Sequence, residues 1–236
     1  AMGVYADMIA REHQFTREDQ DAYAIETLNR SVKATEDGSF KREIAPVTIS
    51  TRKGDVTVEA DELPRKARPD KIPELRPAFS KDGTVTAANA SAISDGAAAL
   101  VMMRLSEAER RGLKPLAKIT ATAAHAHEPA YFTTAPVPAM RKVLERAGWQ
   151  TGDVDLWEIN EAFAVVPMIA IKELGLSHDS VNVHGGACAL GHPIGASGAR
   201  IMTTLIAAME KNDVKKGVAS LCIGGGEGTA VAIERF

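Results

Sequence analysis

Residues 181–200 read VNVHGGACALGHPIGASGAR and decide how this chain should fold. The first four residues are a short run of strand type, and the glycines and the proline that follow allow sharp turns before a helix starts at Ile194. In α/β proteins such a unit of strand, loop and helix places the loop at the carboxyl end of a sheet. We therefore expect a layered α/β domain with functional residues in this loop.

The same alternation of strand and helix patterns continues on both sides of this unit. The expected strands cover 117–124, 154–159, 181–184, 218–223 and 229–234, and the expected helices cover 137–147, 161–174 and 194–211. This βαβαβαββ order predicts a domain over 113–236 whose parallel strands are covered by helices.

The region before residue 113 has a different character. Thr16 resembles a helix N-cap, and apolar residues at helical spacing predict a long amphipathic helix that stops at Gly38. Residues 46–58 predict a β-hairpin, and the proline-rich stretch 61–77 predicts a surface excursion. The apolar run 97–103 has the length of a strand but no evident partner in this chain. We expect it to belong to a sheet that another chain segment completes, and to lie in a large exposed apolar surface.

Composition excludes several classes of function. The 236 residues are 45% hydrophobic and 25% charged, as in an ordinary globular protein, and the net charge of -3 offers no general attraction to nucleic acid or to an anionic membrane. No apolar run is long enough to span a bilayer, and the first residues do not read as a signal peptide but as the middle of a longer protein. Two cysteines, Cys188 and Cys222, suit a reducing, cytoplasmic setting.

Three glycine-containing or polar loops follow predicted strands: NEAFA at 160–164, the loop within 185–200, and CIGGGEG at 222–228. Cys222 ends an apolar strand beside four glycines, so backbone N–H groups there could face a developing oxyanion, although a lone cysteine is more often buried and inert. The glycine run 224–228 lacks the lysine and hydroxyl residue of a phosphate-binding P-loop. His184, Cys188 and His192 have the spacing of metal ligands, but the intervening glycines and proline break any shared helical face, so we expect no metal.

These three motifs, in this order, resemble those of the thiolases, and in particular the acetyl-CoA acetyltransferase type. Further matches at 17–21, 75–79, 83–91 and 95–99 extend the resemblance over the whole chain. It implies a thiolase-like layered fold in which 1–92 form part of a loop domain that contacts coenzyme A (CoA). Residues 93–112 would add a strand and a helix to an N-terminal domain, and 113–236 would form the C-terminal α/β domain.

The resemblance also implies roles for individual residues. His192 would activate a nucleophilic cysteine, Cys222 would move the α-proton, Asn160 would hold a water near the enolate oxygen, and the Gly224 N–H would donate to an oxyanion. An imidazole and a poised thiol suit such proton transfers. The residues implied to contact CoA are Met2, Arg65, Phe79, Ala87, Ser91, Ala162 and Phe163.

The implied activity is Claisen condensation of two acetyl-CoA molecules to acetoacetyl-CoA, or thiolytic cleavage of a 3-ketoacyl-CoA. CoA thioesters would be substrates, with no permanently bound cofactor, and a homo-oligomer is typical of the family. One departure leaves the acyl-chain preference open, because 130–135 read AYFTTA where many short-chain thiolases have a methionine and glycines.

Neither cysteine lies in the motif that carries the acylated cysteine of thiolases. We therefore expect this chain alone to be inactive, with an N-terminal thiolase half supplied by the same or a separate chain, or lost by proteolysis. The alternative is a non-catalytic module that binds CoA or lipid, or a subunit that docks on a thiolase-fold assembly. The presence of both His192 and Cys222 speaks against a purely structural role.

Overall fold

The computed structural model describes residues 1–236 and contains a central four-stranded sheet in the order β3-β6-β5-β4. The strands are β3 (Ala117–Ala126), β4 (Leu156–Ile159), β5 (Lys216–Ile223) and β6 (Glu227–Arg235). Only β4 and β5 run parallel, whereas β6 is antiparallel to both β3 and β5. The expected α/β architecture is confirmed, although only one pair of its strands is parallel. A turn as short as 224–226 can join only antiparallel neighbours.

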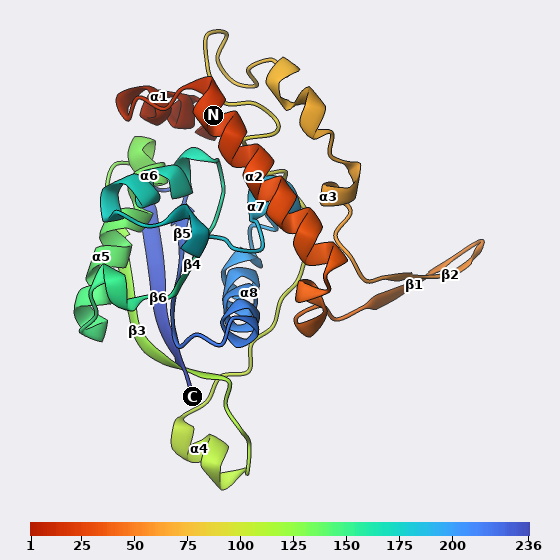
Figure 1. Ribbon diagram of the computed structural model, residues 1–236, viewed down its shortest axis with the longest axis vertical. Helices are drawn as coiled ribbons and strands as arrows, with labels where there is room; N and C mark the ends of the chain where they lie inside the picture. The colour runs from red at the N-terminus through yellow and green to blue at the C-terminus, as the bar shows by residue number, and fades with distance from the viewer.

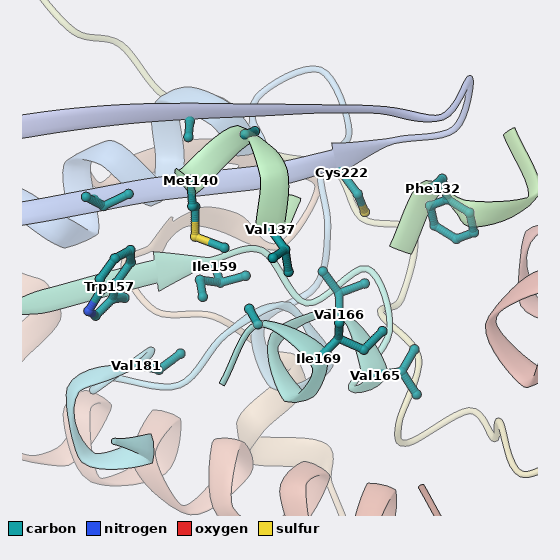
Figure 2. Close-up of a cluster of buried hydrophobic side chains, with 14 of the residues drawn as sticks. Phe132, Val137, Met140, Trp157, Ile159, Val165, Val166, Ile169, Val181 and Cys222 are labelled. Carbon is teal, nitrogen blue, oxygen red and sulfur yellow. The ribbon is translucent and has the colours of Figure 1, made fainter. Parts of the chain in front are cut away.

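Helices cover both faces of this sheet (Figure 1). On one face α5 (Pro136–Ala147) and α6 (Val165–Leu174) enclose the larger apolar core, which includes Met140 and Trp157 (Figure 2). On the other face α8 (Ser197–Lys211) packs against β4 and β5 around a second core that includes Leu205. None of the helices is both long and apolar enough to cross a bilayer.

The expected strand at 181–184 does not form, and only an isolated parallel bridge joins Val181 to Trp157. Asn182 interrupts the strand because its backbone adopts a left-handed φ of 48°. Its side chain instead accepts a hydrogen bond from Ile159 N and donates one to Ile159 O, each at 2.8 Å. The helices expected from 161 and 194 begin later, at Val165 and Ser197, which leaves two longer loops at the same end of the sheet.

In the first part of the chain, α1 (Met2–Glu12) and α2 (Arg17–Glu36) lie near this end of the sheet, whereas the two-stranded hairpin projects away from the sheet (Figure 1). This part contains two long helices, of which α2 matches the predicted one, and a two-stranded hairpin that matches the predicted hairpin. The proline-rich excursion includes short helices with a proline at their first or second position, where a missing N–H is tolerated. The bounds are α1 (Met2–Glu12), α2 (Arg17–Glu36), η1 (Ser39–Arg42), β1 (Val47–Thr51), β2 (Gly54–Val58), α3 (Leu63–Lys66) and η2 (Pro69–Glu74). The remaining short helices are α4 (Leu105–Arg110), η3 (Pro129–Thr134), η4 (Thr151–Asp153), η5 (His178–Ser180) and α7 (Ala187–Leu190).

Helix α2 begins with a capping box. Thr16 Oγ1 accepts a hydrogen bond from Asp19 N at 3.1 Å, and Asp19 Oδ2 accepts one from Thr16 N at 2.9 Å. We expect Thr16→Ala to lower the free energy of unfolding by about 1 kcal/mol, because an N–H of the first turn loses its partner. Urea denaturation followed by circular dichroism measures this loss. A Thr16→Ser variant keeps the hydroxyl and should remain close to the wild type.

Residues 97–103 form no strand in the structure and are largely exposed. The side chains of Val101 and Met102 are 90% and 70% exposed. This segment borders a groove of about 800 Å³ whose other walls come from α8 and from the edge of the sheet, including Met202, Ile206 and Phe236. The expected exposed apolar surface is therefore present. The strand expected here depends on a sheet that another segment completes, and it stays a prediction, since this chain has no strand beside 97–103.

Candidate active site

The structure brings Asn160 and His192 together from two different loops. Asn160 directly follows β4, and its N–H donates to Ser220 O of β5 at 2.9 Å. His192 lies between α7 and α8, and its N–H donates to Ala92 O at 2.8 Å. The Asn160 Nδ2 and His192 Nε2 atoms are 3.3 Å apart. Segments that are far apart in the chain thus converge at the carboxyl ends of the two parallel strands.

The hydrogen bonds of Ser197 assign the tautomer of His192. Ser197 Oγ is 2.6 Å from His192 Nδ1 and 3.1 Å from Pro193 O. The carbonyl can only accept, so the single hydroxyl hydrogen goes to Pro193 and the hydroxyl oxygen accepts from Nδ1–H. His192 Nε2 therefore carries the lone pair and faces Asn160. Burial lowers the pKa of His192, and the Arg200 guanidinium lowers it further, so the neutral imidazole is favoured.

Removing the Ser197 hydroxyl should change this tautomer. In Ser197→Ala the Nδ1–H loses its acceptor, and the Nε2–H form can gain one if the Asn160 amide turns its oxygen toward the ring. We expect the proportion of the Nδ1–H form to fall, as measured by the ¹⁵N chemical shifts of His192 in the folded chain. Ser31→Ala, which removes another buried hydroxyl bonded to His184 O, is the matched control. An unchanged tautomer in Ser197→Ala would contradict the assignment.

Cys222 lies near the end of β5, with its side chain in the larger core on the side of Phe132 (Figure 2). Its side chain is buried, and this burial raises the pKa of the thiol to about 12. His192 hydrogen-bonds Asn160 and Ser197 rather than this thiol. The two groups are linked through the sheet, since Asn160 N pairs with β5 only two residues before Cys222.

Gly224 follows in the turn between β5 and β6. A Cβ atom at Gly224 would be 3.3 Å from Met2 Cε, so Met2, at the start of α1, lies beside this turn. The structure therefore places Met2, Gly224 and Cys222 in one region, although the sequence separates Met2 from the other two by more than two hundred residues.

Three phenylalanine rings extend from the surface toward Cys222. Phe79 is 43% exposed and packs edge-to-face with Phe163 at 6.0 Å between ring centroids. Phe163 in turn packs against the buried Phe132 at 6.1 Å. Ser91 lies alongside, because its Oγ donates to Ala162 O at 3.0 Å. Four of the residues expected to contact CoA, namely Phe79, Ser91, Ala162 and Phe163, therefore form one contiguous group.

Arg65 and Ala87 lie outside this group. Both are exposed, Arg65 on α3 and Ala87 in the loop that precedes Ser91. Neither takes part in the ring contacts or hydrogen bonds that connect the phenylalanines to Ser91.

Glu161 holds the loops in place, and sequence reasoning missed it. Its carboxylate is fully buried and accepts hydrogen bonds from four donors, which lie on α2, at the turn that contains Asn182 (called the 182 turn), and on α7. The donors are Tyr23 OH at 2.9 Å, Thr27 Oγ1 at 2.9 Å, Asn182 Nδ2 at 2.8 Å and Cys188 N at 3.0 Å. A Cβ atom at Gly186 would be 2.5 Å from Glu161 Oε1, so only glycine allows this close approach. The available signal was an acidic residue inside a loop motif with no basic residue near it in the sequence.

The three residues with metal-ligand spacing do not converge. His184 packs edge-to-face with Phe40 at 5.8 Å, and the Cys188 thiol is directed at the Glu161 backbone oxygen at 3.8 Å. His192 faces Asn160 instead. The turns at the intervening glycines separate the three side chains.

Comparison with known proteins places these features in a family. Residues 1–106 match the model of the thiolase N-terminal domain, and 113–235 match that of the thiolase C-terminal domain. Acetyl-CoA acetyltransferase from Shinella zoogloeoides is 51% identical over 234 residues, which are 99% of this chain and 60% of that protein. The crystal structure of the Bacillus anthracis acetyl-CoA acetyltransferase superposes with a TM-score of 0.96 at 44% identity, covering 100% of this chain and 60% of that one.

A thiolase from Ascaris suum in complex with coenzyme A is also similar, with a TM-score of 0.88, 41% identity, and coverage of 100% of this chain and 60% of that chain. The chain thus spans about 60% of the length of the proteins it matches. The two domain models, the shared fold and the sequence identity agree with the loops that carry Asn160, His192 and Cys222, and together they show that this chain belongs to the thiolase family.

Proposed function

We propose that this chain supplies the acid–base residues of an acyl-CoA acyltransferase. The reaction is the Claisen condensation of two acetyl-CoA molecules, or the reverse thiolytic cleavage of a 3-ketoacyl-CoA. One observation carries the proposal: a neutral His192 presents an unprotonated Nε2 beside Asn160. This contact lies at the carboxyl end of the parallel strands β4 and β5, where β4 is followed by Asn160 and β5 carries Cys222. Family membership and the acetyl-CoA acetyltransferases among its relatives support it.

His192 acts as the base in this proposal. Its Nε2 accepts the proton of a cysteine thiol supplied by an N-terminal thiolase portion, and the resulting thiolate attacks the acyl carbon of the thioester. The buried Asn160 Oδ1 has no hydrogen-bond partner, which suits the holding of a water molecule. That water and the protonated His192 would both donate to the enolate oxygen.

Cys222 exchanges a proton with the α-carbon. During cleavage the thiolate of the supplied cysteine adds to the 3-keto carbon, and the bond from that carbon to the α-carbon then breaks. The acyl group stays on the supplied cysteine until CoA accepts it, and the electron pair remains on the leaving acetyl-CoA enolate. Cys222 Sγ–H protonates the α-carbon of this enolate, and the proton of the incoming CoA thiol restores the Cys222 thiol. A pKa of about 12 keeps the Cys222 proton on sulfur until the enolate forms. In condensation the same proton transfer runs in reverse, from the α-carbon to Cys222 Sγ. The backbone N–H of Gly224 donates a hydrogen bond to an oxyanion of the reaction.

CoA would lie along the group formed by Phe79, Ser91, Ala162 and Phe163, with Met2 beside Gly224. The similar thiolase from Ascaris suum is in complex with coenzyme A, which supports CoA as a ligand of this chain. Arg65 is exposed, which suits contact with phosphate at the nucleotide end of CoA. Ala87 is exposed on the loop that precedes Ser91.

The partner in this proposal is the N-terminal portion of a thiolase, on the same or a separate chain. The exposed apolar segment 97–103 and its groove support packing of that portion there. We also propose that the chain divides into a partial loop domain (1–92), a segment that would add a strand and a helix to the N-terminal domain (93–112), and a C-terminal domain (113–236). Homo-oligomer formation and a cytoplasmic location also belong to the proposal, and both cysteines are free thiols.

The test mixes this chain with a separately produced N-terminal thiolase portion and follows cleavage of acetoacetyl-CoA with added CoA. We expect turnover by the mixture and none by either portion alone. Binding of CoA by a well-formed mixture that never turns over would overturn the proposal in favour of a non-catalytic CoA-binding module.

A further inference from the structure

Arg200 lies among three carboxyl groups that the proposed mechanism does not use. It belongs to the first turn of α8, and its Nη1 is 3.8 Å from Glu158 Oε2 of β4 and 3.5 Å from Thr204 Oγ1. Its side chain is 19% exposed and that of Glu158 is 3% exposed. The other two carboxyl groups come from Glu43, just after η1, and Asp61, just before α3.

Glu158 is buried, Glu43 is half-buried and Asp61 is exposed, so one guanidinium faces carboxyl groups in three different environments. Burial raises the pKa of Glu158 to about 8 and that of Glu43 to about 7, and it also raises the pKa of Asp61, while the charge of Arg200 opposes each shift. Burial therefore makes the charged forms of Glu158 and Glu43 more costly than those of exposed carboxyl groups, and Arg200 offsets part of that cost. The charge of Arg200 lowers the pKa of all three carboxyl groups, against the larger effect of burial.

The cluster joins the two elements that carry the candidate site. Arg200 is three residues after Ser197, which holds His192 Nδ1, and Glu158 is two residues before Asn160, which contacts His192 Nε2. The Arg200–Glu158 pair thus spans the start of α8 and the end of β4, as the hydrogen bonds of His192 do.

We propose that Arg200 is a positioning residue: with Glu158 it ties the start of α8 to the end of β4, so that Ser197 and Asn160 keep their contacts to the two nitrogens of His192. Its role in turnover rests on the proposed function, whereas its effect on His192 does not. The guanidinium also adds positive charge near the imidazole, which disfavours the imidazolium form.

Two substitutions separate geometry from charge, and both can be measured in the folded chain by NMR titration of His192. Arg200→Met removes the charge, and we expect the titration midpoint of His192 to rise. Arg200→Lys keeps the charge but loses the planar fork, so the midpoint should stay near that of the wild type. Arg235→Met is the matched control. Arg235 is a partly buried arginine at the end of β6, away from the site, and its guanidinium donates hydrogen bonds to Met209 O and Val214 O.

The complemented assay adds a kinetic measurement. We expect Arg200→Lys to lower kcat by about tenfold with little change in KM, because His192 and Asn160 lose precise alignment. A wild-type kcat in Arg200→Lys, or an unchanged His192 midpoint in a folded Arg200→Met chain, would overturn the inference. If the wild-type mixture is inactive while Arg200→Met still raises the His192 midpoint, the proposed function fails and the link between Arg200 and His192 stands.

Discussion

Replacing His192 with alanine should lower the rate of acetoacetyl-CoA cleavage by the complemented protein about 10²–10⁴-fold, the range expected for loss of a general acid–base group. The effect should fall on kcat more than on KM. In the proposed mechanism Nε2 transfers a proton during the reaction, whereas the group around the phenylalanines holds CoA in the ground state. Steady-state kinetics over a range of acetoacetyl-CoA concentrations separate the two parameters.

The pH dependence provides an independent check on His192. Burial and Arg200 lower its pKa, so the reactive neutral form should persist as pH falls below about 6.5, the usual pKa of histidine. The wild-type rate should therefore decline only at more acidic pH, and this limb of the profile should disappear in His192→Ala. His125→Ala is the matched control, because His125 is a partly exposed histidine beside Lys142, outside the candidate site. Full activity in His192→Ala would remove the imidazole from the mechanism.

Glu161→Ala should lower the free energy of unfolding by roughly 3–5 kcal/mol, because four buried donors lose their acceptor at about 1 kcal/mol each and a small cavity is left. The donors belong to α2, the 182 turn and α7, so the loss affects contacts between segments rather than one helix. Urea denaturation measures the change. Because α7 leads directly into His192, the complemented variant should also be less active even where it is folded.

Two variants bracket the Glu161 prediction. Glu161→Gln keeps the volume and one acceptor oxygen and should lose less stability than alanine. Glu173→Ala removes an exposed carboxylate that pairs with Arg141 on the surface, and it should cost less than about 1 kcal/mol. A Glu161→Ala chain as stable as Glu173→Ala would show that the buried hydrogen bonds do not hold the loops.

The helix α2 and the β1–β2 hairpin could be predicted because their signals are local. The Thr16–Asp19 capping box spans four residues, and the turn at 52–53 lies between the two strands it connects. The expected strand at 181–184 failed for a tertiary reason, since Asn182 uses its side chain to bond β4 instead of continuing an extended backbone. The order of the four strands was also beyond prediction, because it depends on pairings such as that of β3 with β6, more than one hundred residues apart.

For the candidate site, the sequence by itself determined which loops carry chemistry, since the motifs around Asn160, His192 and Cys222 identify the family. Only the tertiary structure decided the tautomer of His192, the four donors gathered by Glu161, and the position of Arg200 among three carboxyls. Each of these depends on atoms from segments that meet only after the chain has folded. Neighbouring residues determine a helix cap or a turn, whereas the protonation and orientation of a buried group are determined by whichever distant side chains the packing brings to it.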